Sequence, residues 1–298
     1  MRSEARRTVI RLAWCLFGAA CGIALALHLV GVPNAPFVLA SLGGSTVFLF
    51  GLTRAPAAQP RALLGGHLFG AAIGIACVQV LGPTLPAYVA AVTLTLGAML
   101  LTRTVHPPAG ANPVLMVYAQ ASWPALLDPV LLGVGSLMAV AFVWSRLYPG
   151  LAPYPVSPLE PSPPSITWGG WSEPCSRTMS TDLPPLPPIT PGRWRHYKGL
   201  DYEVLGQTLP AYVAAITLTL GAMLLTRTVH PPAGANPVLM VYAQASWPAL
   251  LDPVLLGVGS LMAVAFVWSR LYPGLAHYPV SPLEPSPPSI TWGGWSEP

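Results

Sequence analysis

The stretch His106-Pro107-Pro108-Ala109-Gly110-Ala111-Asn112-Pro113 interrupts a hydrophobic region at the end of an apolar segment. Its three prolines and one glycine are unfavourable in a helix interior. Irregular backbone at membrane depth is tolerated only where protein or a water-filled cavity satisfies its polar groups. We therefore interpret the stretch as the wall of a site. The same eight residues return at positions 230–237.

The composition places the chain among membrane proteins. Of its 298 residues, 53% are hydrophobic and 8% are charged, whereas soluble domains carry about 25% charged residues. The basic residues up to position 150 are arginines in short stretches that flank apolar segments, the usual topology signal. They are Arg2, Arg6, Arg7, Arg11, Arg54, Arg61, Arg103 and Arg146. They form no clustered basic surface, so we expect no nucleic-acid partner.

The N-terminus is basic and then apolar from Val9 to Val30, a run long enough to cross a bilayer. Because no small-residue cleavage site is followed by a polar start, we interpret this run as a retained helix rather than a signal peptide. The arginines that precede it predict a cytoplasmic N-terminus. We expect a multi-pass protein of the inner (plasma) membrane, in contact with the lipid bilayer.

The order of the apolar segments predicts an all-α, polytopic helical membrane protein. We expect four to six membrane segments in the first copy and a duplicated C-terminal pair. After the first segment, the others span residues 37–52, 62–81, 87–101, 113–120 and 126–144. A long, a short and a long segment are thus followed by the same pattern. Short segments broken by glycine or proline, in corresponding halves, point to the binding site of a transporter with inverted repeats.

Two short helices are expected to start near Gly43–Thr46 and at Gly110–Asn112. Free amides at helix starts carry partial positive charge, so two such ends that face each other suit a small anion. His106 is either a titratable group of this site or a histidine at an interfacial helix end. His67 either lines the same cavity or is a packed, hydrogen-bonded histidine. Arg103 either adds charge to the site or marks topology.

The candidate substrate-binding residues are thus His106, Pro107, Pro108, Gly110, Asn112, Ser41, Gly43, Gly44, Ser45, Thr46, Arg103 and His67. The two prolines are expected to act structurally, since they end the preceding helix. Asp128 is either a coupling carboxylate or a charge complement to a helix start. The sequence has no phosphate loop, no paired membrane carboxylates and no histidine pair with metal-ligand spacing. We therefore expect no enzyme, no catalytic residue, no cofactor and no metal.

Three glycines, Gly66, Gly70 and Gly74, recur at every fourth position of segment 62–81. They share one helix face and let a neighbouring backbone approach closely. Packing within the protein is the main interpretation, and a homo-oligomer formed through this face is the alternative.

Residues 84–174 and 208–298 match at an offset of 124, with only Val92/Ile216 and Pro153/His277 different. Ordinary divergence of repeats does not keep such identity, so this is a very recent duplication or an error of gene assembly. The duplicate motif comprises His230, Pro231, Pro232, Gly234 and Asn236. The domains are a transmembrane domain at 1–148, a Pro-rich polar tail and linker at 149–207, duplicated transmembrane segments at 208–272 and a Pro-rich tail at 273–298.

The second copy lacks the first three segments, and we expect it to be a stranded duplicate without its other half. If six crossings precede residue 149, the copy must enter the membrane upside down; if the motif is re-entrant, both copies insert the same way round. Arg146 favours six crossings. The spacer at 179–206 resembles the start of a family of short, uncharacterised soluble bacterial proteins, which favours a fused neighbouring reading frame.

At His106–Ala111 the sequence resembles the HPP family of integral membrane proteins. Ala40–Ser45, Gln59-Pro60-Arg61 and Gly65-Gly66-His67 also look like that family. The resemblance covers residues 7–148, and in part 208–272. It implies four membrane helices, and transport, because plastid and cyanobacterial members are linked to nitrite.

The resemblance therefore predicts a transporter or channel for a small solute, an inorganic anion such as nitrite. The alternative is a non-transporting membrane anchor or sensor whose Pro-rich tail binds a partner.

Overall fold

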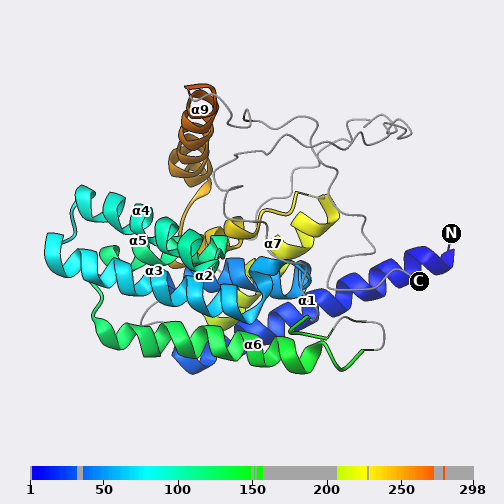
Figure 1. The fold of residues 1–298 in the computed structure, drawn as a ribbon. Coiled ribbons are helices and arrows are strands. Elements are labelled where there is room, and N and C mark those ends of the chain that lie inside the picture. The colour runs from blue at the N-terminus through cyan, green and yellow to red at the C-terminus, as the bar shows by residue number, and fades with distance from the viewer. Residues whose placement is uncertain are drawn as a thin grey trace, which may run out of the picture.

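The computed structural model describes residues 2–31, 36–148, 151, 153–156, 207–226, 228–271 and 278. Within these ranges every regular element is a helix (Figure 1). The first copy forms α1 (Arg2–Val30), α2 (Pro36–Thr46), α3 (Pro60–Leu81), α4 (Leu85–Thr102), α5 (Asn112–Tyr118) and α6 (Leu132–Trp144). The second copy forms α7 (Leu209–Thr226), α8 (Asn236–Tyr242) and α9 (Leu256–Leu271).

Short turns of other helix types join these elements. A π-helical turn, η1 (Val47–Gly51), continues α2, and another, η5 (Leu127–Leu131), leads into α6. The 3₁₀ turns are η2 (Pro56–Ala58), η3 (Pro107–Ala111), η4 (Trp123–Leu126), η8 (Pro231–Ala235) and η9 (Trp247–Leu250), and a third π turn is η10 (Leu251–Leu255).

Five helical stretches are long and apolar enough to cross a membrane. They are Val9–Val30, Pro60–Leu81, Leu85–Thr102, Trp123–Trp144 and Leu209–Thr226. The expected polytopic helical membrane protein is therefore confirmed. Four of the five lie in the first copy, the number that the resemblance to the HPP family implied.

The long helices pack in antiparallel pairs. In the first pair, Trp14 near the middle of α1 stacks on Trp144 at the end of α6, with ring centroids 4.3 Å apart, and Val30 at the end of α1 lies beside Gly133 near the start of α6. In the second pair, α3 and α4 are joined by a tight turn in which Gly82 has a φ of +66°. That left-handed conformation favours glycine.

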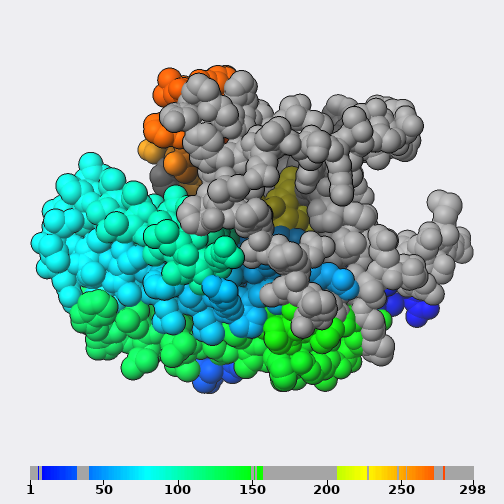
Figure 2. Space-filling view, viewed as in Figure 1, coloured from blue at the N-terminus to red at the C-terminus, as the bar shows by residue number. Residues whose placement is uncertain are grey.

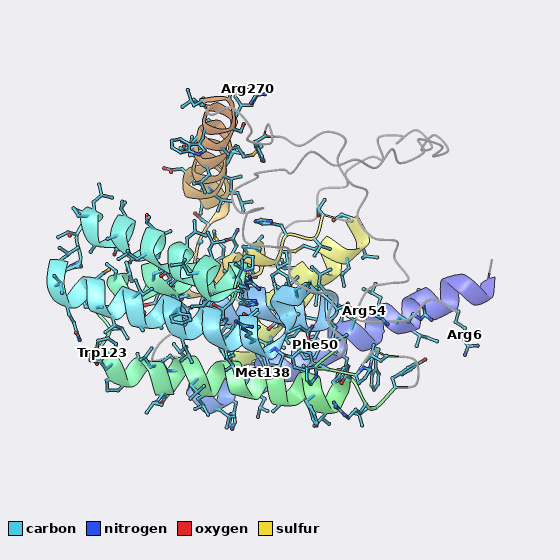
Figure 3. The ribbon with its side chains drawn as sticks, in the orientation of Figure 1. Arg6, Phe50, Arg54, Trp123, Met138 and Arg270 are labelled. Atoms are coloured by element: carbon cyan, nitrogen blue, oxygen red, sulfur yellow. The ribbon has the colours of Figure 1, made fainter. Side chains whose placement is uncertain are left out.

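One end of the bundle, which we call the arginine end, gathers several chain segments. Arg61 donates to the Thr102 carbonyl (2.9 Å), and the Val156 amide donates to Gln59 Oε1 (3.0 Å). Figure 3 shows Arg6 and Arg54 at this end and Trp123 at the other. The start of α1, the start of α3 and the ends of α4 and α6 therefore lie together.

Because α1 leaves the arginine end and α3 starts from it, α2 and η1 must carry the chain back along the whole bundle. By the same reasoning, the segment between α4 and α6 carries the chain to the opposite end. The first copy thus makes six passes, and Val156 returns to the end where α1 starts. Four of these passes are helical stretches long and apolar enough to cross a membrane, and the number of membrane crossings stays a prediction.

The predicted break in the helix of segment 37–52 does not occur, so that prediction is wrong. Helix α2 continues through Gly43 and Gly44 and passes directly into η1. Every residue from Ala40 to Gly51 is buried. Glycine costs a helix about 1 kcal/mol, and packing on several sides outweighs that cost. There is consequently no helix start near Gly43–Thr46, and only the start at Asn112 exists.

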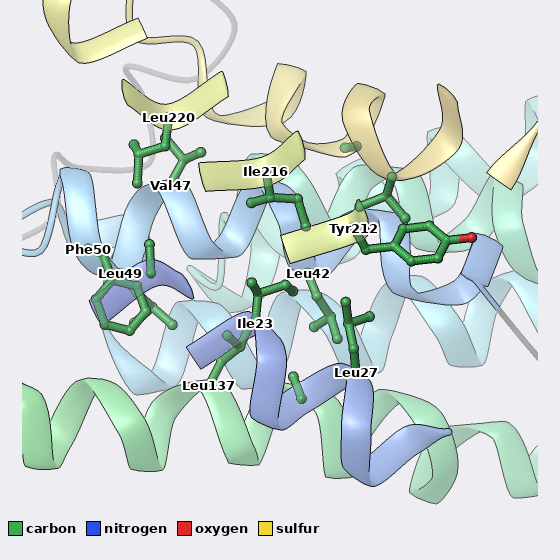
Figure 4. Packing of buried hydrophobic residues seen from close by; sticks show 14 of the residues in the cluster. Ile23, Leu27, Leu42, Val47, Leu49, Phe50, Leu137, Tyr212, Ile216 and Leu220 are labelled. Atoms are coloured by element: carbon green, nitrogen blue, oxygen red, sulfur yellow. The ribbon is translucent and has the colours of Figure 1, made fainter. Parts of the chain in front are cut away.

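The main apolar core contains both copies. Figure 4 shows Ile23 and Leu27 of α1 and Leu42 of α2 beside Tyr212 and Ile216 of α7. The sequence suggested that the second copy would be stranded, but the structure shows it inside the bundle. It packs on α1 and α2. By contrast α9 stands apart from the bundle (Figures 1 and 2), with most of its side chains exposed.

Candidate functional site

The stretch that follows α4 is held in one conformation by its own sequence. Arg103 caps α4 in the left-handed region (φ 55°). His106 is extended (φ −130°, ψ 96°), as expected of a residue before proline. Pro107 then starts η3, and Asn112 starts α5 with Pro113 in its first turn. We call residues 106–118 the first HPP segment and residues 230–242 the second HPP segment.

The glycine stripe of α3 receives the first HPP segment. A Cβ at Gly66 would lie 2.9 Å from His106 Cβ, and a Cβ at Gly70 would lie 2.8 Å from the Ala109 carbonyl oxygen. At Gly74 it would lie 2.8 Å from Met116 Cβ. Real Cβ atoms do not approach so closely, so this packing requires glycine. The predicted packing role is confirmed, and the stripe is filled by the same chain rather than by an oligomer partner.

Ser45 of α2 joins two histidines that lie far apart in the sequence. Its Oγ is 2.8 Å from Nε2 of His67 and 2.8 Å from Nε2 of His106. His106 Nδ1 lies 2.6 Å from the Ala57 carbonyl oxygen. Asn112 Nδ2 lies 3.0 Å from His67 Nδ1 and 3.0 Å from the His67 carbonyl oxygen. These five residues form what we call the His–Ser–His chain.

The end groups fix the direction of every hydrogen bond in this chain. A carbonyl oxygen only accepts, so His106 carries its proton on Nδ1 and, when neutral, accepts at Nε2. The amide nitrogen of Asn112 only donates, so His67 accepts at Nδ1 and donates from Nε2. The Ser45 hydroxyl therefore accepts from His67 and donates to His106. The order of donation is Asn112, His67, Ser45, His106, Ala57.

The chain is enclosed by protein. His106, Asn112 and Ser45 are 0% exposed, and His67 is 1% exposed. The Phe48 ring covers His106, with centroids 5.3 Å apart. Unpaired buried polar groups cost about 1–3 kcal/mol each, and the pairing described here removes most of that cost.

Two buried polar atoms beside the chain have no hydrogen-bond partner within the described residues. They are Asn112 Oδ1 and Ser41 Oγ. Ser41 lies one helical turn before Ser45, and its carbonyl oxygen is 3.0 Å from Ser45 Oγ. The Ser45 hydroxyl thus has a second acceptor within reach, since one hydrogen can serve either Ser41 or His106.

The other predicted residues lie outside the chain. Thr46 is buried, but its hydroxyl bonds the Leu42 carbonyl of its own helix (2.8 Å). Pro108 packs on Gly44. Arg103 is exposed and contributes no described contact to the two histidines. Arg103, the one arginine among the candidate residues, therefore lies outside the site.

Two further candidate residues also lie outside the His–Ser–His chain, and Asp128, in the first turn of η5, fits the alternative of a charge complement to a helix start. A Cβ at Gly110 would meet nothing within 4 Å among the described residues. Asp128 is exposed and has non-helical dihedral angles just before α6.

The second HPP segment repeats the sequence but not the site. His230 is exposed, and its ring has no described hydrogen bond, whereas His106 is fully buried. The difference arises because His230 has no equivalent of His67 and Ser45 beside it. Gly234 instead packs on Gly43, at a different face of α2.

Sequence reasoning missed one member of the chain, the Ala57 carbonyl. A backbone acceptor leaves no side-chain signal, and only the neighbouring Gln59-Pro60-Arg61 pointed to this loop. Groups of three or more histidine, cysteine, aspartate or glutamate residues that could hold a metal ion do not occur in the described ranges.

Comparison with known proteins supports the assignment that these residues suggest. The family model described as the HPP transmembrane region matches residues 4–155 and 200–279. A transmembrane protein of Dictyostelium discoideum is 33% identical over 126 residues, which are 38% of this chain and 40% of that protein. A second one from the same organism is 30% identical over 125 residues, 38% of this chain and 44% of that protein.

The matched region thus spans less than half the length of these two relatives. No solved structure matches the chain. The family model covers well over half of the residues, and its match includes the His–Ser–His chain. This protein belongs to the HPP transmembrane family.

Proposed function

We propose that this protein is a transporter or channel for a small solute, and that the solute is an inorganic anion such as nitrite. The observation that carries the proposal is the His–Ser–His chain, buried between α2, α3 and the first HPP segment. Ionisable residues inside a membrane protein are costly, so they indicate a functional site by default. Membership of a family of multi-pass membrane proteins supports the same conclusion.

The His–Ser–His chain carries no fixed positive charge, and this favours an anion that moves together with a proton. Amide, hydroxyl and neutral imidazole groups carry no net charge, and burial of an unpaired anion among them is very costly. Within the chain only His67 and His106 can acquire a positive charge. Arg61 bonds a carbonyl at the arginine end, and Arg103 is exposed. A proton on an imidazole therefore provides the counter-charge.

The hydrogen bonds suggest how a proton prepares the site. When His106 gains a proton at Nε2, this nitrogen becomes a donor and no longer accepts from Ser45. The Ser45 hydroxyl then turns its hydrogen to the Ser41 carbonyl, 3.0 Å away, or to an anion. Two donors, His106 Nε2 and the Ser45 hydroxyl, are thereby released beside a positive charge. An anion fits that arrangement, and a cation does not.

Uptake by proteoliposomes tests the proposal with the full chain. We expect nitrite influx to be accompanied by proton influx, followed with an enclosed pH-sensitive dye. Substitution His106→Gln should reduce the initial rate at least about tenfold, as removal of a relay group does in catalysis. His230→Gln is the matched control, because it changes the same motif at an exposed position, and it should leave the rate unchanged.

Three results would count against the proposal. Equal rates for His106→Gln and the unchanged protein would remove the chain from the transport path. Anion influx without proton influx would refute the coupling. Folded protein with no flux across a panel of anions would favour the membrane anchor or sensor.

A further inference from the structure

The two near-identical helices α4 and α7 bury different amounts of the same face. In α7, Tyr212, Ile216, Leu220 and Leu224 are all 0% exposed. They belong to the main core, in which α7 packs on α1 and η1 (Figure 4 shows the first three). Their counterparts in α4 are Tyr88, Val92, Leu96 and Leu100. Val92 is 41% exposed and Leu96 is 54% exposed. The first copy therefore leaves open a surface whose duplicate fits the α1–α2 face.

The HPP segments show the same asymmetry. A Cβ at Gly234 would lie 2.7 Å from the Gly43 carbonyl oxygen and 2.9 Å from Gly44 Cα, so backbone meets backbone there. At Gly110, the counterpart of Gly234, a Cβ would meet no described residue within 4 Å. Gly44 is enclosed from both sides, because its Cβ would lie 2.8 Å from Pro108 Cβ and 2.8 Å from the Pro231 carbonyl oxygen. The α1–α2 face is thus shaped to receive an HPP segment.

The direction of α7 shows which helix of a second chain fits the same face. Figure 4 shows Tyr212 beside Leu27 and Ile216 beside Ile23, and a Cβ at Gly221 would lie 3.3 Å from Leu16 Cδ1. Thus α7 runs antiparallel to α1 and ends towards the arginine end, as α4 does. The helices α4 and α7 therefore run in the same direction along the bundle.

For the chain's own second copy, this direction has a cost in a bilayer. The first copy leaves from Val156 at the arginine end, and α7 begins at the opposite end. Between them lie residues 157–206, with charged side chains such as Asp182, Arg193 and Lys198. Charged residues cost about 2.5–3.5 kcal/mol each at the centre of a membrane helix. By contrast, α4 of a second chain in the same bilayer already runs in the required direction.

We propose that the α1–α2 face is a self-association surface, on which residues 85–118 of a second copy of this chain seat as residues 209–242 do here. The contact combines the open face of α4 with the backbone approach of Gly110 to Gly43. It lies away from the glycine stripe of α3, which is already filled. The second copy within the chain and the second chain compete for one face.

Cross-linking in native membranes tests this with the full chain. In a variant whose four cysteines are replaced by alanine, Leu16→Cys is combined with Gly97→Cys, and a short thiol-reactive linker is added. Gly97 is the counterpart of Gly221, and a Cβ there meets nothing within 4 Å in the part of the chain that the structure describes. We expect a product of twice the monomer mass. The pair Leu16→Cys with Gly221→Cys reports the chain's own second copy, through a product of monomer mass.

Substitutions at the two matched glycines sharpen the test. Gly110→Leu has room in the isolated chain, so the protein should elute as before, while the interchain product should fall about tenfold or more because the side chain overlaps Gly43. Gly234→Leu should raise the interchain product, since it removes the competitor. The interchain product should also persist when the lipid-to-protein ratio is increased.

The proposal is overturned if the Gly97 pair gives no interchain product in folded protein, whatever the Gly221 pair gives. It is also overturned if the interchain product survives Gly110→Leu, or if it declines in proportion to lipid dilution as random collision does.

Discussion

Removal of the Ser45 hydroxyl should destabilise the protein more than removal of any other hydroxyl on α2. Ser45 is the only contact through which His67 Nε2 and His106 Nε2 are paired within the described residues. Ser45→Ala leaves one donor and one acceptor without partners in a fully buried place. The backbone of α2 is unaffected, because alanine is the best helix former.

The magnitude follows from the two lost hydrogen bonds. Side-chain hydrogen bonds between membrane helices contribute about 0.6–1.7 kcal/mol each, and an unsatisfied buried group costs about 1–3 kcal/mol. These ranges overlap, and together they give a loss of about 2–4 kcal/mol for Ser45→Ala. Thr46→Ala is the matched control. It removes a bond to the carbonyl of the same helix and should cost about 1 kcal/mol or less.

Unfolding of the purified protein by SDS in mixed micelles, followed by circular dichroism, gives the two free energies. A double-mutant cycle with His106→Gln adds a direct measure of the contact, for which we expect a coupling of about 1 kcal/mol or more. If Ser45→Ala and Thr46→Ala cost the same, or if the cycle is additive, the hydroxyl does not bridge the two histidines and the deduced order of donation is wrong.

Three other predictions concern packing, pH and the arginine end. Gly70→Ala should cost about 1–3 kcal/mol by overpacking against Ala109 and Asn112. Gly97→Ala, whose added methyl group meets no described residue within 4 Å, should be neutral or stabilising; SDS unfolding compares them. Burial raises the pKa of Tyr154, whose hydroxyl has no partner within the described residues. The stability that the buried, neutral Tyr154 side chain contributes is therefore complete below its ordinary pKa of about 10 and is lost as the pH rises beyond it. Tyr154→Phe should consequently reduce alkaline unfolding in a pH titration, and identical titrations of the two proteins would contradict this. Arg103→Ala should change nitrite uptake less than about twofold, because the side chain is exposed and exposed charges contribute little; a loss comparable to His106→Gln would return Arg103 to the site.

The sequence allowed prediction of the parts that rest on local rules. The long apolar runs gave the membrane helices, the glycine spacing of α3 gave a close packing face, and His106-Pro107 gave a helix end followed by extended backbone. The approach of the stretch around Ser45 to the first HPP segment also followed from the pattern of two short segments. In each case, helix periodicity or backbone sterics determines the outcome.

The remaining features depend on contacts between distant residues. Gly43 and Gly44 suggested a broken helix, but tertiary packing outweighs their low helix propensity. The role of the Ala57 carbonyl has no side-chain signature. The burial of His106 and the exposure of His230 cannot follow from their identical neighbours, since His67 and Ser45 on other helices make the difference.

The ends of the His–Ser–His chain have a consequence for energy conservation in the cell. A proton on His67 can pass from Nε2 through the Ser45 hydroxyl to His106 Nε2, in the order of donation, but both termini of the His–Ser–His chain are groups that do not exchange protons near neutral pH, the Ala57 carbonyl and the Asn112 amide. The chain therefore stores a proton and does not conduct one. If the proposed transport holds, such a chain keeps a proton without dissipating the transmembrane gradient, and proton leak measured without the transported anion should be small.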